Sequence, residues 1–506
     1  MNIIERKDTL DPFGRIGGQR KSILDEERKH YFIQNASRQI PLFVKVHKAW
    51  TLMLIKQEVI SAERGKKILE ALYRIDERAI TEMIQNWDPS GWEPMMQLER
   101  YLTAKIGQIA SDVNIARTIP PPFYRMELAD LLIGLIEATI SFRKILLKNA
   151  SAHVSTVMPG YTHLQHAQPT TYGHYLLGFF DAVDRASLQV EQAYSKTNRF
   201  ELGCGALSGT SFDIDRQMPA DLLGFDGLVE HSNDAVAATD FIVDCVAALT
   251  NLMIPLSRVA NDLDIWSSFE FGMVEIADHL TNPSSMMPQK KNPAIFEICR
   301  MALGQILGSF GEIVCSAHAV PYGDVIEMRE LAFKIHPTIR EVIRVFALMG
   351  EGIDTLIVHK EMMLKHARAG FSTVTELAAL LYREANIPLR MAHGIVAEVV
   401  RTCLAEGRLA TEVSPELVKQ AALKVTGKTI RIDSDPLESA LDPSRFVEVH
   451  DSQGGVAPSE VNRMIKVRDK DLTKTVERQA KRLEKLHEAD SELNRQVERI
   501  LNSRGK

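Results

Sequence analysis

The feature that most constrains this chain is a set of long segments whose apolar residues recur at spacings of three and four. The segment Asp240–Trp266 is apolar on most faces, with one internal proline, Pro255. A helix that is apolar nearly all round is usually buried among other helices. Met126–Leu147 and Thr375–Ala385 show the same spacing, while strand-like alternation between hairpin turns is scarce. The sequence therefore predicts an all-α fold with minor strand content.

Composition limits the classes of protein that such helices can form. Hydrophobic residues make up 45% and charged residues 25% of the chain, which is the balance of a soluble globular protein. The net charge of -6 gives no overall basic field, so we expect neither nucleic acid nor a membrane as a partner. This net charge is compatible with a small-molecule anionic substrate that binds in a locally cationic pocket. The longest apolar stretch, around Phe241–Leu256, is interrupted by Asp244 and Asn251, which argues against a membrane span.

The spacing of the cysteines and the first residues of the sequence indicate the cellular compartment of the protein. The five cysteines are far apart and form no C-x-x-C pair, so we expect neither a disulfide scaffold nor a structural metal site. The first residues, MNIIERKDTLDPFGR, mix both charge signs and lack the apolar core of a signal peptide. We therefore expect a cytoplasmic protein.

Two segments mark predicted domain boundaries. Thr118–Pro122 contains three consecutive prolines and cannot be helical throughout. In Ala369–Thr373, Gly370 can end one helix, and Ser372 or Thr373 can cap the next. We predict an N-terminal helical domain at 1–117, a central helical-bundle domain at 118–368, and a C-terminal helical domain at 369–506.

The last segment, 472–501, has a heptad-like pattern. Its seam residues alternate steps of four and three, with Gln479 and Asp490 as polar interruptions, and they are Leu472, Val476, Gln479, Leu483, Leu486, Asp490, Leu493, Val497 and Ile500. One interpretation is an amphipathic helix that packs on its own subunit. The other is packing between subunits.

Three polar stretches do not contribute to helix packing, and the first is Thr281–Pro293. Its three prolines exclude a continuous helix and predict a loop. Two serine hydroxyls stand beside two ammonium groups and two kinds of amide, a set that can hold an anion and lower the cost of a serine alkoxide. The alternative is a surface loop that caps the following helix.

The second stretch is Met158–Pro169, where Pro-Gly and Gln-Pro bracket several hydrogen-bonding side chains. His163 could relay protons near neutral pH. His163 and His166 have the spacing of a metal pair, but no Asp, Glu or Cys stands nearby, so we expect no metal. A purely structural histidine is the competing interpretation.

The third stretch, Glu201–Thr210, has the spacing G-x-G-x-x-x-G without a preceding apolar strand. A dinucleotide-binding loop requires a different glycine spacing after a strand. Close backbone approach in a tight loop is the favoured use of these glycines.

Together these stretches resemble the fumarase/aspartase superfamily, and within it argininosuccinate lyase. The similarity covers roughly residues 98–458, and five blocks match in the family's order: GYTHLQHAQP (160–169), GCGALSGT (203–210), HSNDAVAATDF (231–241), SSMMPQKKNP (284–293) and GGVAP (454–458). The resemblance implies a three-domain, mostly helical protein whose central bundles join into a twenty-helix core in a homotetramer. It also implies active sites built from three subunits, with no cofactor.

The reaction that the resemblance implies is β-elimination, which releases fumarate from a succinyl-type substrate through an aci-carboxylate. Ser284 matches the base on the signature loop 281–293, while Lys290 and Asn292 match the groups that stabilise the developing charge. Thr162 and His163 match the substrate-binding threonine and the histidine assigned to proton transfer. The remaining substrate contacts implied by the matching blocks are Ser285, Gln165, Arg117, Thr118, Tyr322 and Arg329.

Several positions depart from the family pattern. A block like H-x-G-R-S-R-N-D appears here as Asn114–Pro121, so that Ile119 and Pro120 replace an arginine and an asparagine. A block like E-D-x-H ends in Met96 instead of histidine, and Ile326 stands where a glutamine is usual. Pro283 replaces the glycine before the signature serines, which should stiffen the start of the loop.

Three hypotheses follow, because proton abstraction is retained while substrate recognition is altered. The first is a carbon–nitrogen lyase that cleaves an N-substituted aspartate or similar adduct to fumarate and an amine or amino acid, or runs the addition in reverse. The altered positions favour a substrate other than argininosuccinate. The second is the same elimination on a substrate that does not yield fumarate. The third is a catalytically silent protein with a structural role, as some lens crystallins have.

Overall fold

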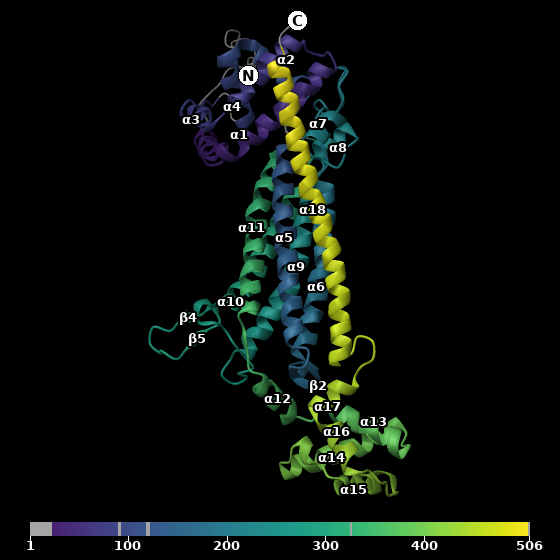
Figure 1. Ribbon diagram of the computed structural model, residues 1–506. Helices are drawn as coiled ribbons and strands as arrows, with labels where there is room; N and C mark the ends of the chain where they lie inside the picture. The colour runs from purple at the N-terminus through teal and green to yellow at the C-terminus, as the bar shows by residue number, and fades with distance from the viewer. Residues whose placement is uncertain (1–22, 90–92, 118–121, 324–325, 504–506) are drawn as a thin grey trace.

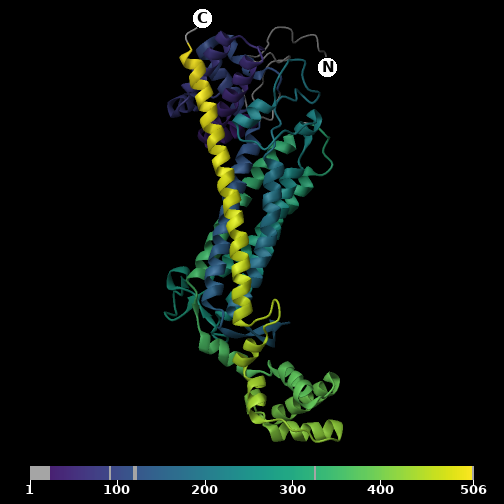
Figure 2. The same ribbon diagram turned by 45° about the vertical axis from the view of Figure 1, so that its right-hand side comes forward.

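The computed structural model of the chain describes residues 23–89, 93–117, 122–323 and 326–503, with the side chains of 326, 328 and 329 left out of the description. The molecule is elongated, with long helices packed side by side along its axis (Figures 1 and 2). We call the end that carries the N-terminal helices the upper end, as in Figure 1. The opposite end, where strand β2 lies, is the lower end.

Five helices form the central bundle, and they run alternately down and up between the two ends. They are α5 (Phe123–Ala152), α6 (Tyr172–Thr197), α9 (Asp240–Trp266), α10 (Ala294–Ala317) and α11 (Ile326–Asp354). The 30 residues of α5 extend over about 45 Å at the usual helical rise.

Shorter elements cover the two ends of the bundle. The upper end holds α1 (Leu24–Lys56), α2 (Ala62–Tyr73), α3 (Glu77–Gln85), α4 (Pro94–Ile106), the 3-10 helix η2 (Gly107–Asn114), α7 (Gln217–Leu222) and α8 (Ser232–Ala237). Towards the lower end lie β1 (Val157–Thr162), β2 (Gln165–Thr171), β3 (Val274–Glu275), η3 (Asp278–Leu280), β4 (Asn282–Pro283), β5 (Lys291–Asn292), β6 (Ile357–Val358) and α12 (Lys360–Ala369). The strands pair antiparallel as β1–β2, β3–β6 and β4–β5.

A separate helical unit projects below the bundle. It consists of α13 (Val374–Ala385), α14 (Leu389–Glu406), η4 (Ala410–Glu412), α15 (Pro415–Thr426), α16 (Ser434–Leu441) and α17 (Pro443–Val449). Its apolar residues form a hydrophobic cluster of their own, distinct from the main core that runs through the bundle. The domain limits at 117 and 368 stay a prediction.

The predicted all-α fold is confirmed. Helix α9 has the predicted bounds Asp240–Trp266, and α5 contains the predicted segment Met126–Leu147. Leu249, Leu256 and Leu263 of α9 are fully buried, because α6, α10 and α11 pack against this apolar helix. Its Pro255 is accommodated inside the helix.

Two bundle helices, α9 and α10, are long and apolar enough to cross a membrane by length and composition alone. Core helices of water-soluble proteins pass the same test. Half of the most apolar window of α9 is buried, but only 22% of that of α10. Met301 and Leu307 of α10 are accordingly exposed. The bundle therefore presents an uncovered apolar face along α10.

The C-terminal helix α18 (Pro458–Asn502) lies along the bundle from the lower to the upper end (Figures 1 and 2). Most of its seam faces its own chain, since Leu472, Leu493 and Val497 are buried, whereas Leu483 is exposed. This is the first of the two interpretations of the heptad pattern.

The polar interruptions of the seam have partners within the chain. Gln479 Nε2 donates to Glu137 Oε1 at 3.4 Å, and Lys45 Nζ pairs with Asp490 Oδ1 at 2.8 Å. Arg468 also holds Asp181 through two charge-assisted hydrogen bonds of 2.6 and 2.5 Å. Apolar and charged contacts thus fix α18 along the bundle.

We predict that Leu472→Ala destabilises the protein far more than Leu483→Ala. Leu472 is 3% exposed, so its truncation removes buried surface and leaves a cavity that costs about 2–5 kcal/mol. Leu483 is 41% exposed on the same helix, so its truncation should cost well below about 1 kcal/mol. Thermal unfolding at one protein concentration and scan rate compares the two variants. Equal losses would contradict the prediction and would show that another subunit covers Leu483.

Candidate active site

The segment around His163 forms a tight β-hairpin at the lower end. β1 pairs with β2 up to the Thr162–Gln165 pair, so that His163 and Leu164 form a two-residue connection. Both residues have positive φ, 54° and 59°, as a type I′ turn requires. A leucine is unusual in this conformation. The turn exposes His163 at the tip, without a hydrogen-bond partner among the described residues. The sequence predicted a polar segment here but not a hairpin.

The signature loop 281–293 is closed at its base by β4 and β5. Asn282 pairs with Asn292, and Asn292 Nδ2 donates to the carbonyl oxygen of Asn282 at 2.8 Å. The prediction of a non-helical segment is confirmed. Ser285 and Lys290 are exposed, while Ser284 is half-buried. The loop therefore projects polar groups into solvent from a fixed two-strand base.

The Ser284 hydroxyl accepts hydrogen bonds from the backbone. The N–H of Met287 donates to Ser284 Oγ at 3.0 Å and that of Met286 at 3.4 Å. Backbone donors aimed at an oxygen stabilise negative charge on it. This arrangement lowers the cost of forming an alkoxide at Ser284.

The two adjacent lysines of the loop have different environments. Lys291 Nζ pairs with Asp278 and Glu275, each at 2.5 Å, and these carboxylates raise the pKa of Lys291. Lys290 has no carboxylate within ion-pair distance in the described part of the chain. Lys291 thus anchors the loop to η3 and β3, while Lys290 remains available to an anion.

At the upper end, Arg117 is held against a buried histidine. Its two terminal nitrogens each lie 3.3 Å from a ring nitrogen of His47, and one of them donates to Asn114 Oδ1 at 2.9 Å. Burial lowers the pKa of Arg117 to about 9, an effect that the carboxylate of Glu99 opposes. Burial, and then the charge of Arg117, hold the pKa of His47 well below 6.5. Sequence reasoning missed His47, because a lone histidine in an apolar helix gives no signal of a partner.

Tyr322 connects two of the matching blocks. Its hydroxyl donates to Asp234 Oδ1 at 2.5 Å, and Asp234 belongs to the 231–241 block on α8. The carboxylate of Asp234 raises the pKa of Tyr322. Tyr322 is 67% exposed, so its ring remains available to a ligand. Thr118 and the side chain of Arg329, which the resemblance implies as substrate contacts, fall outside the described residues.

The glycine-rich loop 201–210 is a tight turn, as predicted. Gly203, Gly205 and Gly209 all have positive φ. A Cβ at Gly205 would lie 2.3 Å from the carbonyl oxygen of Gly209. The backbone segments at these two glycines therefore approach too closely for a side chain at Gly205. Arg216 fixes the loop by donating to the carbonyl oxygen of Leu202 at 2.8 Å.

The candidate residues form two groups at opposite ends of the bundle. The lower group lies on the hairpin and the signature loop, and consists of Thr162, His163, Gln165, Ser284, Ser285, Lys290 and Asn292. The upper group consists of Arg117 and Tyr322. Bundle helices of up to 30 residues, about 45 Å, separate the two groups within one chain.

Within the described residues, no group of three His, Cys, Asp or Glu side chains lies close enough to hold a metal ion. The hairpin places His163 at the exposed tip, while His166 packs against the ring of Tyr161 at 5.3 Å. All five cysteines are described, and all are free thiols.

Comparison with known proteins gives consistent matches along the chain. A family model described as Lyase matches residues 19–308, and one described as Argininosuccinate lyase C-terminal matches residues 371–448. Argininosuccinate lyase of Methanocaldococcus jannaschii is 35% identical over 472 residues, which are 92% of this chain and 94% of that protein.

Solved structures with the same fold include two of EDDS lyase. The crystal structure of EDDS lyase in complex with formate has a TM-score of 0.84 at 30% identity, and the alignment covers 96% of this chain and 97% of that one. A variant of EDDS lyase with bound fumarate has a TM-score of 0.84 at 30% identity, with 96% of both chains covered.

The helical bundle, the signature loop and the family matches together define a lyase. The chain belongs to the fumarase/aspartase superfamily, as an argininosuccinate lyase-like member. It is a carbon–nitrogen lyase. These relatives favour the enzymatic hypotheses over a silent structural role.

We predict that His47 makes the protein less stable in mild acid. Below about pH 6.5 the unfolded chain binds a proton on His47 that the folded protein does not bind. The free energy of unfolding therefore falls as the pH is lowered through this range, by up to about 1.4 kcal/mol per pH unit.

Thermal unfolding between about pH 7.5 and 5.5 measures this effect. The His47→Gln variant should lose less stability across the range than the native protein does. His30→Gln, which changes an exposed histidine of the same helix, is the control. An unchanged slope in His47→Gln would contradict the prediction.

Proposed function

We propose that the protein cleaves an N-substituted aspartate by β-elimination, releasing fumarate and an amine or amino acid. The observation that carries this proposal is the environment of Ser284, whose Oγ accepts two backbone hydrogen bonds. The same loop carries Lys290, which has no ion pair among the described residues. The similarity of the chain to argininosuccinate lyase and to EDDS lyase with bound fumarate supports the same substrate class.

In the proposed mechanism, the Ser284 alkoxide removes the proton from Cβ of the succinyl group. The electron pair moves into the adjacent carboxylate, which becomes an aci-carboxylate with extra negative charge. Lys290 and the amide of Asn292 stabilise this charge, and preorganised donors of this kind contribute about 3–4 kcal/mol each. The carbon–nitrogen bond then breaks, and its electron pair leaves with nitrogen, which takes a proton. We propose that His163, at the hairpin tip, donates this proton and accepts the one that Ser284 loses when its alkoxide is formed again.

The active site is proposed to form between subunits. The upper and lower groups cannot meet within one chain, because the bundle holds them apart. A neighbouring subunit that packs antiparallel would bring its lower group to this chain's upper group. The exposed apolar face of α10 supports such packing, since it would be buried in a shared bundle. We propose a homotetramer whose sites draw residues from three subunits, located in the cytoplasm.

The substrate is proposed to differ from argininosuccinate. Ile119, Pro120 and Ile326 replace three polar residues of the family pattern, and an apolar replacement leaves a substrate's polar groups unpaired. The same replacements favour a second candidate, elimination on a substrate that lacks one carboxylate. Identification of the product by mass spectrometry separates these two candidates.

We predict that fumarate release with one N-substituted aspartate is lost in Ser284→Ala. The assay offers argininosuccinate, aspartate and a panel of N-substituted aspartates to the purified oligomer. Loss of the proton-abstracting group should lower kcat by about 10²–10⁴-fold, with little change in Tm because the side chain is small and half-buried. Ser439→Ala, an exposed serine of α16, is the control. Full activity in Ser284→Ala would disprove the assignment of the base.

We also predict that two inactive variants restore each other when they are co-expressed. Ser284→Ala damages the lower group and Arg117→Gln the upper group, so mixed oligomers would contain some sites in which both groups are native. Activity should return after co-expression but not after mixing of stable, separately assembled oligomers. Failure of mass-verified mixed oligomers to regain activity would show that each site uses a single chain.

A further inference from the structure

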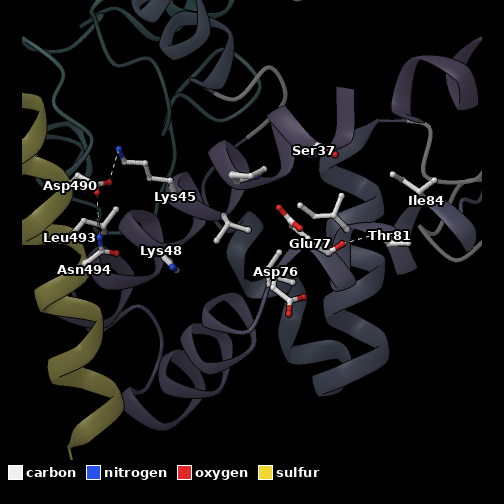
Figure 3. A pocket seen from close by; sticks show the side chains of 14 residues that line it. Ser37, Lys45, Lys48, Asp76, Glu77, Thr81, Ile84, Asp490, Leu493 and Asn494 are labelled. Atoms are coloured by element: carbon white, nitrogen blue, oxygen red, sulfur yellow. Dashed lines mark hydrogen bonds and ion pairs between the residues drawn. The ribbon is translucent and has the colours of Figure 1, made fainter. Parts of the chain in front are cut away.

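A groove at the upper end lies outside both groups of candidate catalytic residues. It has a volume of about 630 Å³ and is formed by α1, α3 and the last turns of α18 (Figure 3). Val44, Ile80 and Leu493 give it a buried apolar wall. Lys45 and Lys48 lie towards α18, while Asp76 and Glu77 lie towards α3 (Figure 3).

One cation in this groove lacks a counter-ion. Lys45 pairs with Asp490 at 2.8 Å. Lys48 lies at the same side of the groove, but its ammonium group has no carboxylate within ion-pair distance among the described residues. It is half-buried, 5.5 Å from the centre of the Tyr73 ring. Burial lowers the pKa of Lys48, whereas the charge of Asp490 raises it. A half-buried unpaired ammonium group attracts an anion.

One carboxylate of the groove, that of the solvent-exposed Glu77, also lacks a partner among the described residues. Asp76 caps α3, because its Oδ1 accepts from the backbone N–H of Ala79 at 2.9 Å. Glu77 uses only its carbonyl oxygen, which accepts from Thr81 Oγ1 at 2.8 Å. Its carboxylate has neither a hydrogen bond nor an ion pair in the described part of the chain. Lys48 and Glu77 do not pair with each other in the described part of the chain, although both line the groove, one from α1 and the other from α3.

We propose that this groove binds a zwitterionic amino acid. The carboxylate of the ligand pairs with Lys48, its ammonium group pairs with Glu77, and its hydrocarbon part covers the wall of Val44, Ile80 and Leu493. Such a ligand bridges the two charges, and it joins α1 to α3 beside the last turns of α18. The site is separate from the signature loop, which lies at the other end of the bundle.

Calorimetric titration of the intact oligomer with two amino acids tests this proposal. The two charges are close together in L-leucine and far apart in 6-aminohexanoate. At least one of them should bind. Single-charge analogues serve as controls. Hexanoate and 4-methylpentanoate lack the ammonium group of 6-aminohexanoate and leucine, respectively. Hexylamine and 3-methylbutylamine lack the carboxylate of the same two amino acids. The single-charge analogues should bind at least about tenfold more weakly. Absence of binding by both amino acids at millimolar concentration would overturn the proposal, and so would equal binding of a single-charge analogue.

Matched variants locate the binding. Lys48→Met and Glu77→Gln should each weaken it about tenfold, because each removes one charge and keeps a similar volume. Glu63→Gln, on the exposed side of α2, should leave it unchanged. Hydrogen exchange of α3 and of residues 486–497 should slow when the ligand is bound. Binding that survives both groove variants would overturn the assignment. Fumarate release by these variants should be unchanged, so the outcome is independent of the proposed elimination.

Discussion

The rest of the structure depends on the burial of α9. A helix that is apolar on nearly all sides is stable in water only when other helices cover it, and α6, α10 and α11 pack against it. Helices of 24 to 30 residues then set the length of the bundle. Segments that connect them can emerge only at its two ends, so every polar loop that carries chemistry lies at one end or the other. The division of the candidate site into two groups is therefore a consequence of packing the core.

Much of the fold could be predicted from sequence, because helical periodicity over long segments reports directly on burial. The bounds of α9, the proline-rich loop around Ser284 and the tight turn at Gly205 all follow from local rules of hydrophobicity and backbone freedom. The heptad pattern predicted α18 but not its partner. Apolar seam residues do not reveal which apolar surface covers them, and the structure places that surface on the same chain.

The candidate site was less predictable, because its properties depend on contacts between distant residues. Lys290 and Lys291 are adjacent and chemically identical, and only the position of Glu275 and Asp278 makes one an anchor and leaves the other unpaired. The contact of His47 with Arg117 joins positions 70 residues apart. No periodicity or motif encodes such a pair, so tertiary packing decides which polar residues have partners.

The course of α18 has a consequence for biosynthesis. Lys45 of the first described helix pairs with Asp490, and Lys66 donates to the carbonyl oxygen of Ser503, near the end of the chain. Since synthesis proceeds from the N-terminus, α1 and α2 leave the ribosome long before the residues that complete their surface exist. The N-terminal helices therefore stay incompletely covered until the residues of α18 have been synthesised. Contacts of such large sequence separation also make folding slow. The last described helix is thus the one that completes the surface of the first.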